Sequence, residues 1–376
     1  MKKILQIVPR PPGPFDGVGD YALTLAGKLR DLAVHDTVFA VHHFDRKANV
    51  NGFDLYPLQS VAHGNLEFDQ IILHYVNYGY HNRGTPFGLV SILSRLQRQN
   101  NGRFLTIFHE LYASGPPWQS AFWLRPLQKR IATSVAGISD ACVVSNETMA
   151  RELAILTPNA NALVHPVISN FGEPTLAAGQ IAQRDPHRWA VCGGTLPVER
   201  SVRSFRAILS RIPSEIAPRE LFIFGGNDNP AVRSLIGAFP KIEIHYRPNI
   251  AASDASDILS KSSFQWLDYF HRRDVPTDVL LKSTAFAAAC AHGVIPVLPH
   301  PGRPILLRGD SLPGPFFVGA GTISVPSNSE RGEIGSVYYN WYRKHGSSEQ
   351  LVRSVADLLG ILIRDDSSPL EVVANH

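Results

Sequence analysis

One stretch of the sequence, residues 278–297, restricts the fold more than any other part of the chain. An alanine-rich run over 285–291 favours a helix, and Gly293 stands where a glycine commonly ends one. A short apolar run follows directly and has the length of a buried strand. This order predicts a loop, a closely packed short helix and a strand, which together form one unit of an α/β sheet.

The expected start of this helix carries groups that suit an anion. Lys282, Ser283 and Thr284 place an ammonium group and two hydroxyl groups beside backbone N–H groups that lack partners within the helix. The positive end of the helix dipole adds to this preference for a phosphate or diphosphate. Because Ser and Thr are also common N-caps, a capped helix without a ligand is the alternative.

The segment 289–297, ACAHGVIPV, resembles the A-x-A-x-G-x-P-V segment of GT-B-fold glycosyltransferases, particularly those of family 4. The resemblance implies that this segment lies in the C-terminal Rossmann-like domain and binds the diphosphate of a nucleotide-sugar. The family usually has two glutamates around this helix, and this sequence has Leu280 and Ala288 at those positions. Asp274 or Asp278 would then be left to approach the sugar.

The bulk properties are those of a globular protein. The chain has 376 residues, of which 44% are hydrophobic and 18% charged, and this length is sufficient for two domains. A net charge of +4 gives no support for a nucleic-acid binder. The widely spaced Cys142, Cys192 and Cys290 are expected to be free thiols, and no apolar run approaches the roughly 20 residues that cross a bilayer. We therefore expect a cytoplasmic protein.

Strands followed by glycine turns and helices recur in both halves of the chain. This pattern predicts an α/β protein with two Rossmann-like, doubly wound domains that face a central cleft, which is the GT-B arrangement that the resemblance implies. We place an acceptor-side domain at 1–170, a linker at 171–188 and a donor-nucleotide domain at 189–340. The terminal helices within 341–376 are expected to cross back to the N-terminal domain.

A loop rich in Pro and Gly, residues 9–20, separates the first expected strand from a helix expected over 21–32. Because the loop is not G-x-G-x-x-G, it weighs against a dinucleotide site. Its end resembles the G-G-V/I-G loop of family 4, which implies that it faces the acceptor and the donor phosphates. The residues concerned are Gly17, Val18, Gly19 and Asp20. A plain connecting loop is the alternative.

A strand expected over 104–108 delivers His109 and Glu110 to the end of the sheet where open α/β folds bind ligands. His109 is our candidate catalytic residue, because an imidazole can position a sugar hydroxyl or transfer a proton and its neighbour can hold its tautomer. Family 4 enzymes have a similar strand-end His, which implies an approach to the donor sugar. A structural histidine is the alternative.

Strands of the second half end in residues that suit a nucleotide. Strands expected over 189–192 and 220–224 both lead into glycine turns, and a helix is expected over 201–209. Glycine lets the backbone approach a phosphate closely, and arginine supplies a fixed cation. The resemblance implies that the donor contacts are Gly194, Thr195, Arg200, Gly225 and Arg247, together with Lys282, Ser283 and Thr284. Plain turns are the alternative.

The aromatic and basic segment 118–131, which contains Trp123, has two interpretations. As an amphipathic helix it would rest on an anionic membrane and place the protein at the inner face of that membrane. As a packed surface helix it would simply have a solvated basic face. Both stay open.

Together these patterns predict a glycosyltransferase that moves a sugar from a nucleotide-diphosphate sugar to a glycan, lipid-linked or small-molecule acceptor, as in polysaccharide biosynthesis. No Asp-x-Asp pair is present, so neither a metal nor a cofactor beyond the co-substrate is expected. The missing glutamates leave open a catalytically silent partner subunit that binds a nucleotide-sugar. A GT-B-fold epimerase is a further alternative, although the sparse acidic residues weigh against it.

Overall fold

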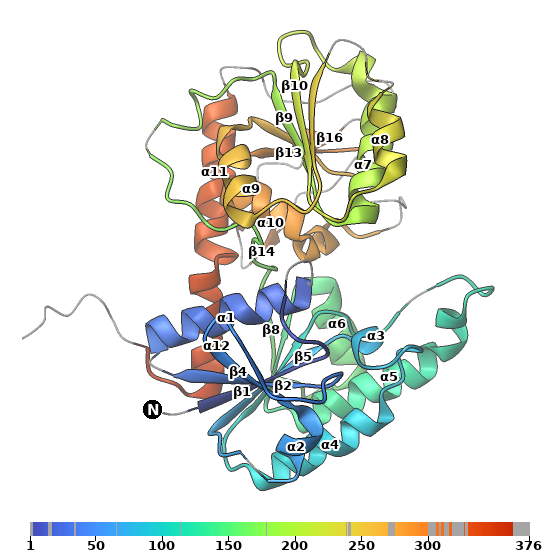
Figure 1. Ribbon diagram of the computed structural model, residues 1–376, viewed down its shortest axis with the longest axis vertical. Helices are drawn as coiled ribbons and strands as arrows, with labels where there is room; N and C mark the ends of the chain where they lie inside the picture. The colour runs from blue at the N-terminus through green and yellow to red at the C-terminus, as the bar shows by residue number, and fades with distance from the viewer. Residues whose placement is uncertain are drawn as a thin grey trace, which may run out of the picture.

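Two mainly parallel sheets, one in each half of the chain, organise the molecule (Figure 1). Helices flank both sheets, so the two halves are the Rossmann-like domains that the sequence predicts. The computed structural model describes residues 3–13, 17–33, 35–64, 66–113, 115–177, 179–237, 239, 242–269, 275–299, 306–307, 310–311, 316–317, 327 and 330–363.

The N-terminal sheet has the strand order β3-β4-β2-β1-β5-β6-β7-β8, and only β3 and β4 pair antiparallel among these neighbours. Its central strands are almost fully buried, because helices pack on both faces. The strands are β1 (Lys3–Val8), β2 (Asp36–Val41), β3 (Ala48–Val50), β4 (Phe53–Pro57), β5 (Gln70–Tyr75), β6 (Phe104–Phe108), β7 (Ala141–Val144) and β8 (Ala162–Val164). The helices are α1 (Gly17–Ala33), α2 (Leu58–Ala62), α3 (Asn77–Tyr80), α4 (Phe87–Gln99), α5 (Ser120–Ile138) and α6 (Glu147–Leu156).

The C-terminal sheet is parallel, with the order β11-β10-β9-β12-β13-β16. Its core contains the fully buried side chains of Trp189 and Trp266. The strands are β9 (Arg188–Cys192), β10 (Glu220–Phe224), β11 (Glu243–Arg247), β12 (Phe264–Trp266), β13 (Ile295–Leu298) and β16 (Phe316–Phe317), with a separate pair β14 (Leu306–Leu307) and β15 (Asp310–Ser311). The helices are α7 (Thr195–Ile208), α8 (Pro230–Ile236), α9 (Ala252–Lys261), α10 (Thr284–Ala291) and α11 (Arg331–His345), with 3₁₀ turns at Leu209–Arg211 and Thr277–Lys282.

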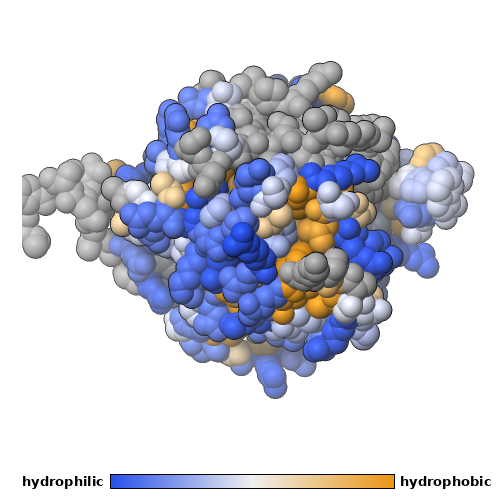
Figure 2. All heavy atoms as spheres, turned by 90° about the horizontal axis from the view of Figure 1, so that it is seen from above, coloured by the Kyte–Doolittle hydropathy of each residue, from blue (hydrophilic) through white to orange (hydrophobic). Residues whose placement is uncertain are grey.

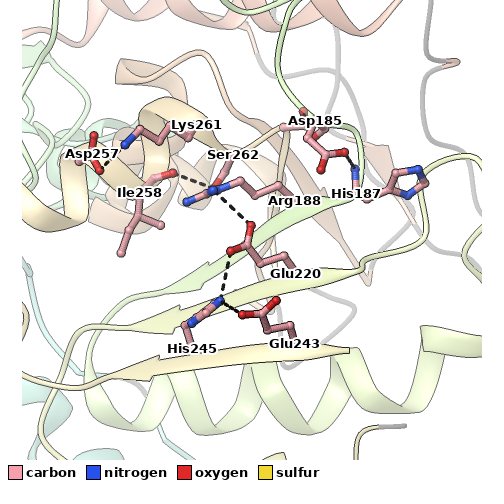
Figure 3. Close-up of polar contacts among 11 residues, drawn as sticks. Asp185, His187, Arg188, Glu220, Glu243, His245, Asp257, Ile258, Lys261 and Ser262 are labelled. Atoms are coloured by element: carbon pink, nitrogen blue, oxygen red, sulfur yellow. Dashed lines mark hydrogen bonds and ion pairs between the residues drawn. The ribbon is translucent and has the colours of Figure 1, made fainter. Parts of the chain in front are cut away.

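Charged side chains join three strands of the C-terminal sheet, β9, β10 and β11, near the residues where these strands begin (Figure 3). Glu220 and Glu243 are register partners on β10 and β11, which brings two like charges together. Arg188 lies 3.2 Å from Glu220, and His245 Nε2 lies 3.1 Å from Glu220 and 3.3 Å from Glu243. His245 therefore bridges the two carboxylates, and Arg188 pairs with Glu220 alone. Figure 2, which views this domain from above, shows an apolar area among mostly hydrophilic side chains.

The last helix, α12 (Ser348–Leu359), lies among the elements of the N-terminal domain (Figure 1). Its apolar residues Leu351 and Val355 are fully buried in one cluster with Leu25 and Leu29 of α1. Over the residues that the structure describes, the chain therefore passes between the domains twice, once after β8 and once between α11 and α12. The domain limits drawn from the sequence stay a prediction.

Glu173 joins these two passages. One of its carboxylate oxygens accepts hydrogen bonds from the Tyr342 hydroxyl at 2.7 Å and the Ser348 N–H at 2.8 Å, and the other accepts from the Ser348 hydroxyl at 2.8 Å. A carboxylate at the start of α12 also interacts favourably with the helix dipole. The outgoing and returning segments are thereby held side by side.

Two helices begin earlier than the sequence indicates. Helix α1 starts at Gly17, so the end of the expected loop is the first helical turn. Helix α7 starts at Thr195 and not near residue 201, because Pro197 falls in the first turn, where its missing N–H would have no partner in the helix. The position of Asp274 lies outside the described residues.

Candidate functional site

The starts of four helices meet at a cavity of about 680 Å³ between the domains. Gly17 of α1 lines it from the N-terminal domain, and Thr195 of α7, Ala252 of α9 and Thr284 of α10 line it from the C-terminal domain. A helix start exposes unpaired backbone N–H groups and the positive end of the helix dipole. Asp20 is the one charged side chain among the described residues that line the cavity, so the groups there that suit an anion are the backbone N–H groups of the helix starts.

Two glycine turns in contact form part of the cavity wall. Gly193, Gly225 and Gly226 have φ angles of +145°, +88° and +62°, a region that favours glycine. A Cβ atom at Gly225 would lie 2.5 Å from the carbonyl oxygen of Gly193, and one at Gly226 would lie 2.4 Å from the nitrogen of Thr195. The backbone therefore comes closer here than any side chain permits. The predicted donor residues that line the cavity are Gly194, Thr195, Gly225 and Thr284.

Sequence reasoning missed other residues of this cavity. Asn249 and Ile250 line it beside Asn170 and Phe171. Asn249 has a φ of +54°, and its N–H donates a hydrogen bond to Gly226 O at 2.9 Å. An Asn after Pro248 is a turn signal that could have been used. Nothing in the residue types of Asn170 and Phe171 indicates a ligand.

A smaller cavity of about 210 Å³ adjoins the first one, since Gly17 and Thr284 line both. Three further residues that the sequence singled out lie here: Val18, His109 and Lys282. The structure therefore brings the candidate catalytic residue within reach of the helix starts at the larger cavity.

Buried partners hold His109 in place. Its Nε2 lies 3.3 Å from Nδ1 of His74, and Nε2 of His74 lies 2.8 Å from Oε1 of Gln6. Tyr21 packs edge-on against both imidazole rings. Burial, assisted by the Lys282 charge, lowers the pKa of His109 to about 3. Burial and the neighbouring His109 lower the pKa of His74 well below its ordinary value, so both rings are neutral at neutral pH.

Sequence reasoning offered Glu110 as a group that can hold the tautomer of His109, and the structure pairs it with another residue. Glu110 Oε1 instead lies 3.2 Å from Lys282 Nζ, and this ion pair crosses the cleft. Successive side chains of a strand point in opposite directions, which separates Glu110 from its neighbour. Ser283 is 5% exposed, and its hydroxyl accepts a hydrogen bond from the Phe286 N–H at 3.2 Å, so it is the N-cap of α10.

Arg200, Arg247 and Gly19 line neither cavity. Arg200 Nε donates a hydrogen bond to the Asp268 carbonyl at 2.8 Å, and Arg247 is exposed at the end of β11. Gly19 lies in the first turn of α1. Their roles toward a ligand stay predictions.

The positions of the two missing glutamates are buried, since Leu280 and Ala288 are both 0% exposed. Asp278 also lines neither cavity. Its carboxylate accepts hydrogen bonds from the Thr148 N–H at 2.7 Å and the Thr148 hydroxyl at 2.8 Å. Asp278 thus joins the C-terminal domain to the start of α6 and has no contact with the expected sugar site.

The described residues contain no group of three or more His, Cys, Asp and Glu side chains placed to hold a metal ion. Metal independence stays a prediction. Cys142, Cys192 and Cys290 are free and buried, as expected.

The two facing domains define a GT-B fold, and solved structures share it. No protein-family model and no curated protein matches the sequence. The chain is similar to an alpha-glucosyltransferase in complex with UDP-glucose and DNA containing an abasic site, with 10% identity and a TM-score of 0.58 over 96% of this chain and 99% of that chain. It is also similar to an E. coli structure described as trehalose-6-phosphate bound with UDP-2-fluoro glucose, with 11% identity and a TM-score of 0.57 over 96% and 100%. AviGT4, a glycosyltransferase involved in Avilamycin A biosynthesis, has 13% identity and a TM-score of 0.51 over 96% and 97%.

Proposed function

We propose that this protein is a glycosyltransferase that takes its sugar from a nucleoside-diphosphate sugar. The observation that carries the proposal is the meeting of four helix starts at one cavity between the domains. Their unpaired N–H groups suit a diphosphate. Solved structures of the same fold hold UDP-glucose and UDP-2-fluoro glucose, which supports a donor of this class. The resemblance to family 4 is part of the proposal.

The arrangement of the two cavities suggests how the donor lies. The diphosphate would occupy the region of Thr195 and Thr284, and the nucleoside would lie toward Asn249 and Ile250 in the larger cavity. The sugar would extend into the smaller cavity, where His109 lies. No cofactor other than this co-substrate enters the proposal.

In the transfer, the bond between the anomeric carbon and the phosphate oxygen breaks, and its electron pair leaves with the diphosphate. An acceptor hydroxyl oxygen forms the new bond to the anomeric carbon, and its proton passes to an oxygen of the departing diphosphate. Preorganised N–H groups at the helix starts would stabilise the charge that builds on the diphosphate. Lys282 would add a cation after it leaves Glu110.

The donor proposal is tested with the purified protein and the diphosphates of uridine, guanosine, adenosine and thymidine, with CMP included. A ligand that binds only the folded state raises the melting temperature. We expect a clear shift with one diphosphate, and a loss of that shift in a Gly225→Ala variant. No shift with any nucleotide in a folded sample would overturn the proposal.

We further propose a membrane-associated, lipid-linked glycan as the acceptor. The first part of α5 projects from the N-terminal domain (Figure 1). Trp118, two residues before this helix, is 83% exposed, and Trp123, within its first turns, is 71% exposed. The Trp123 indole donates a hydrogen bond to Pro117 O at 2.8 Å, which fixes the aromatic cluster. Residues 111–138 include three basic and no acidic side chains, a composition that suits anionic lipids. None of the helices in the described ranges is long and apolar enough to span a bilayer.

A catalytically silent partner subunit is the second candidate. It is favoured by the buried, apolar Leu280 and Ala288 at the positions where family 4 has glutamates. Release of the free sugar or its transfer from the bound donor distinguishes the two functions. Binding without any turnover, across a panel of acceptors, would favour the silent subunit.

A further inference from the structure

Three polar side chains form a chain that ends at the smaller cavity. Gln6 on β1 and His74 on β5 lie on neighbouring strands and are both 0% exposed. His109 directly follows β6, the next strand of the sheet, and lines the cavity. The distances are 2.8 Å from Gln6 Oε1 to His74 Nε2 and 3.3 Å from His74 Nδ1 to His109 Nε2.

The atom at the Gln6 end determines which atoms donate along this chain. An amide oxygen only accepts hydrogen bonds, so the hydrogen of His74 resides on Nε2. A neutral His74 then has a lone pair at Nδ1 and accepts a hydrogen bond from Nε2–H of His109. A neutral His109 with its hydrogen on Nε2 has a lone pair at Nδ1. Burial keeps both rings neutral, and the Lys282 ammonium further disfavours a cation on His109.

We propose that Gln6 and His74 are positioning residues that hold His109 in the tautomer with its hydrogen on Nε2. His109 then offers Nδ1 as a hydrogen-bond acceptor, and the group that it recognises is a hydroxyl of the substrate. Only the identity of that hydroxyl, a donor-sugar hydroxyl, rests on the proposed function. The tautomer is a property of the free protein.

The test is a long-range ¹H–¹⁵N correlation spectrum of the full chain with ¹⁵N-labelled histidine at neutral pH. A His109→Phe spectrum identifies the His109 signals, and a His74→Phe spectrum those of His74. We expect a protonated Nε2 and a bare Nδ1 for both residues. A hydrogen on Nδ1 of His109, or a charged ring, would overturn the proposal. Because no ligand is needed, this outcome is independent of whether a nucleotide-sugar binds.

Two variants distinguish a role of Gln6 in positioning His109 from a role of Gln6 in general packing. Gln6→Leu removes the terminal acceptor, so His109 is expected to lose its single tautomer and show averaged signals. Tyr80→Phe is the matched control, because its hydroxyl bonds the carbonyl oxygens of His74 at 2.9 Å and Ile7 at 3.2 Å without joining the chain. An unchanged His109 tautomer in a folded Gln6→Leu variant would overturn the role of Gln6. If that variant does not fold, the wild-type spectrum alone decides whether His109 has its hydrogen on Nε2.

Discussion

Lys282 Nζ lies 3.2 Å from Glu110 Oε1, and this ion pair links the start of α10 to the end of β6 across the cleft. The two side chains are 31% and 39% exposed, so the pair contributes at most about 1 kcal/mol to stability. Its larger effect concerns binding. The ammonium group that would meet a diphosphate already has an anionic partner, and a donor must compete with Glu110 for it.

Substitution of Lys282 and substitution of Glu110 should therefore change the affinity for a nucleoside diphosphate in opposite directions. Lys282→Ala is expected to weaken binding about tenfold, and Glu110→Gln to strengthen it up to about fivefold, because each pair interaction is worth about 1 kcal/mol. Titration calorimetry measures both. Lys261→Ala, which breaks an exposed pair with Asp257, is the control. Equal affinities in all four proteins would exclude Lys282 from the phosphate site.

A side chain at Gly225, where the two glycine turns touch beside the larger cavity, should lower the free energy of unfolding. Gly225→Ala places a Cβ atom 2.5 Å from Gly193 O at a φ of +88°, so we expect a loss of more than about 2 kcal/mol in the free energy of unfolding. Gly27→Ala in α1 is the control, because its Cβ would meet nothing within 4 Å and alanine favours helix by about 1 kcal/mol. Urea denaturation compares them. A stable Gly225→Ala variant would contradict the close approach.

Asp278 should matter for stability although it touches no cavity. Asp278→Ala removes two hydrogen bonds at the start of α6, which is expected to cost about 1–2 kcal/mol. Asp257→Ala, at an exposed pair on α9, should change stability by less than about 0.5 kcal/mol. If the two variants unfold at the same denaturant concentration, the link between Asp278 and Thr148 is not formed in solution.

Buried histidines should make the protein sensitive to mild acid. Burial lowers the pKa of His109 to about 3 and that of His292 to about 4, from an ordinary value of 6.5. Between these values and pH 6.5 the unfolded chain binds more protons, so stability is full above about pH 6.5 and is lost as the pH falls. Each such histidine contributes up to about 1.4 kcal/mol per pH unit. Denaturation from about pH 7.5 to about pH 5 measures the slope, and His292→Asn should reduce it.

The exposed tryptophans should govern any contact with lipid. Wild-type protein is expected to float with vesicles that contain phosphatidylserine and to stay unbound with phosphatidylcholine alone. A Trp118→Ala, Trp123→Ala double variant should lose this binding. Ile155→Ala removes an 80% exposed apolar side chain elsewhere and should retain it. Failure of the wild-type protein to bind either vesicle would overturn the proposal that its acceptor is membrane-associated.

The sequence predicted elements well where one apolar run forms one strand. Strands β6 and β10 have the expected limits, whereas α1 and α7 start earlier, because Gly and Pro fit a first helical turn as well as a loop. The glycine turns were placed at the cavity because parallel strands end at one edge of a sheet. The contacts of His109 and Lys282 were not predictable. They join residues 35 and 172 positions away, and residue types do not indicate such partners.

The hydrogen bonds of Glu173 to Tyr342 and Ser348 hold the two interdomain passages of the chain together at one place. The two chain passages lie side by side at this point, while the pairs of Asp278 with Thr148 and of Lys282 with Glu110 join the domains elsewhere along the cleft. A wider cleft would therefore require these two pairs to separate, so access to the helix starts is tied to the breaking of two polar contacts.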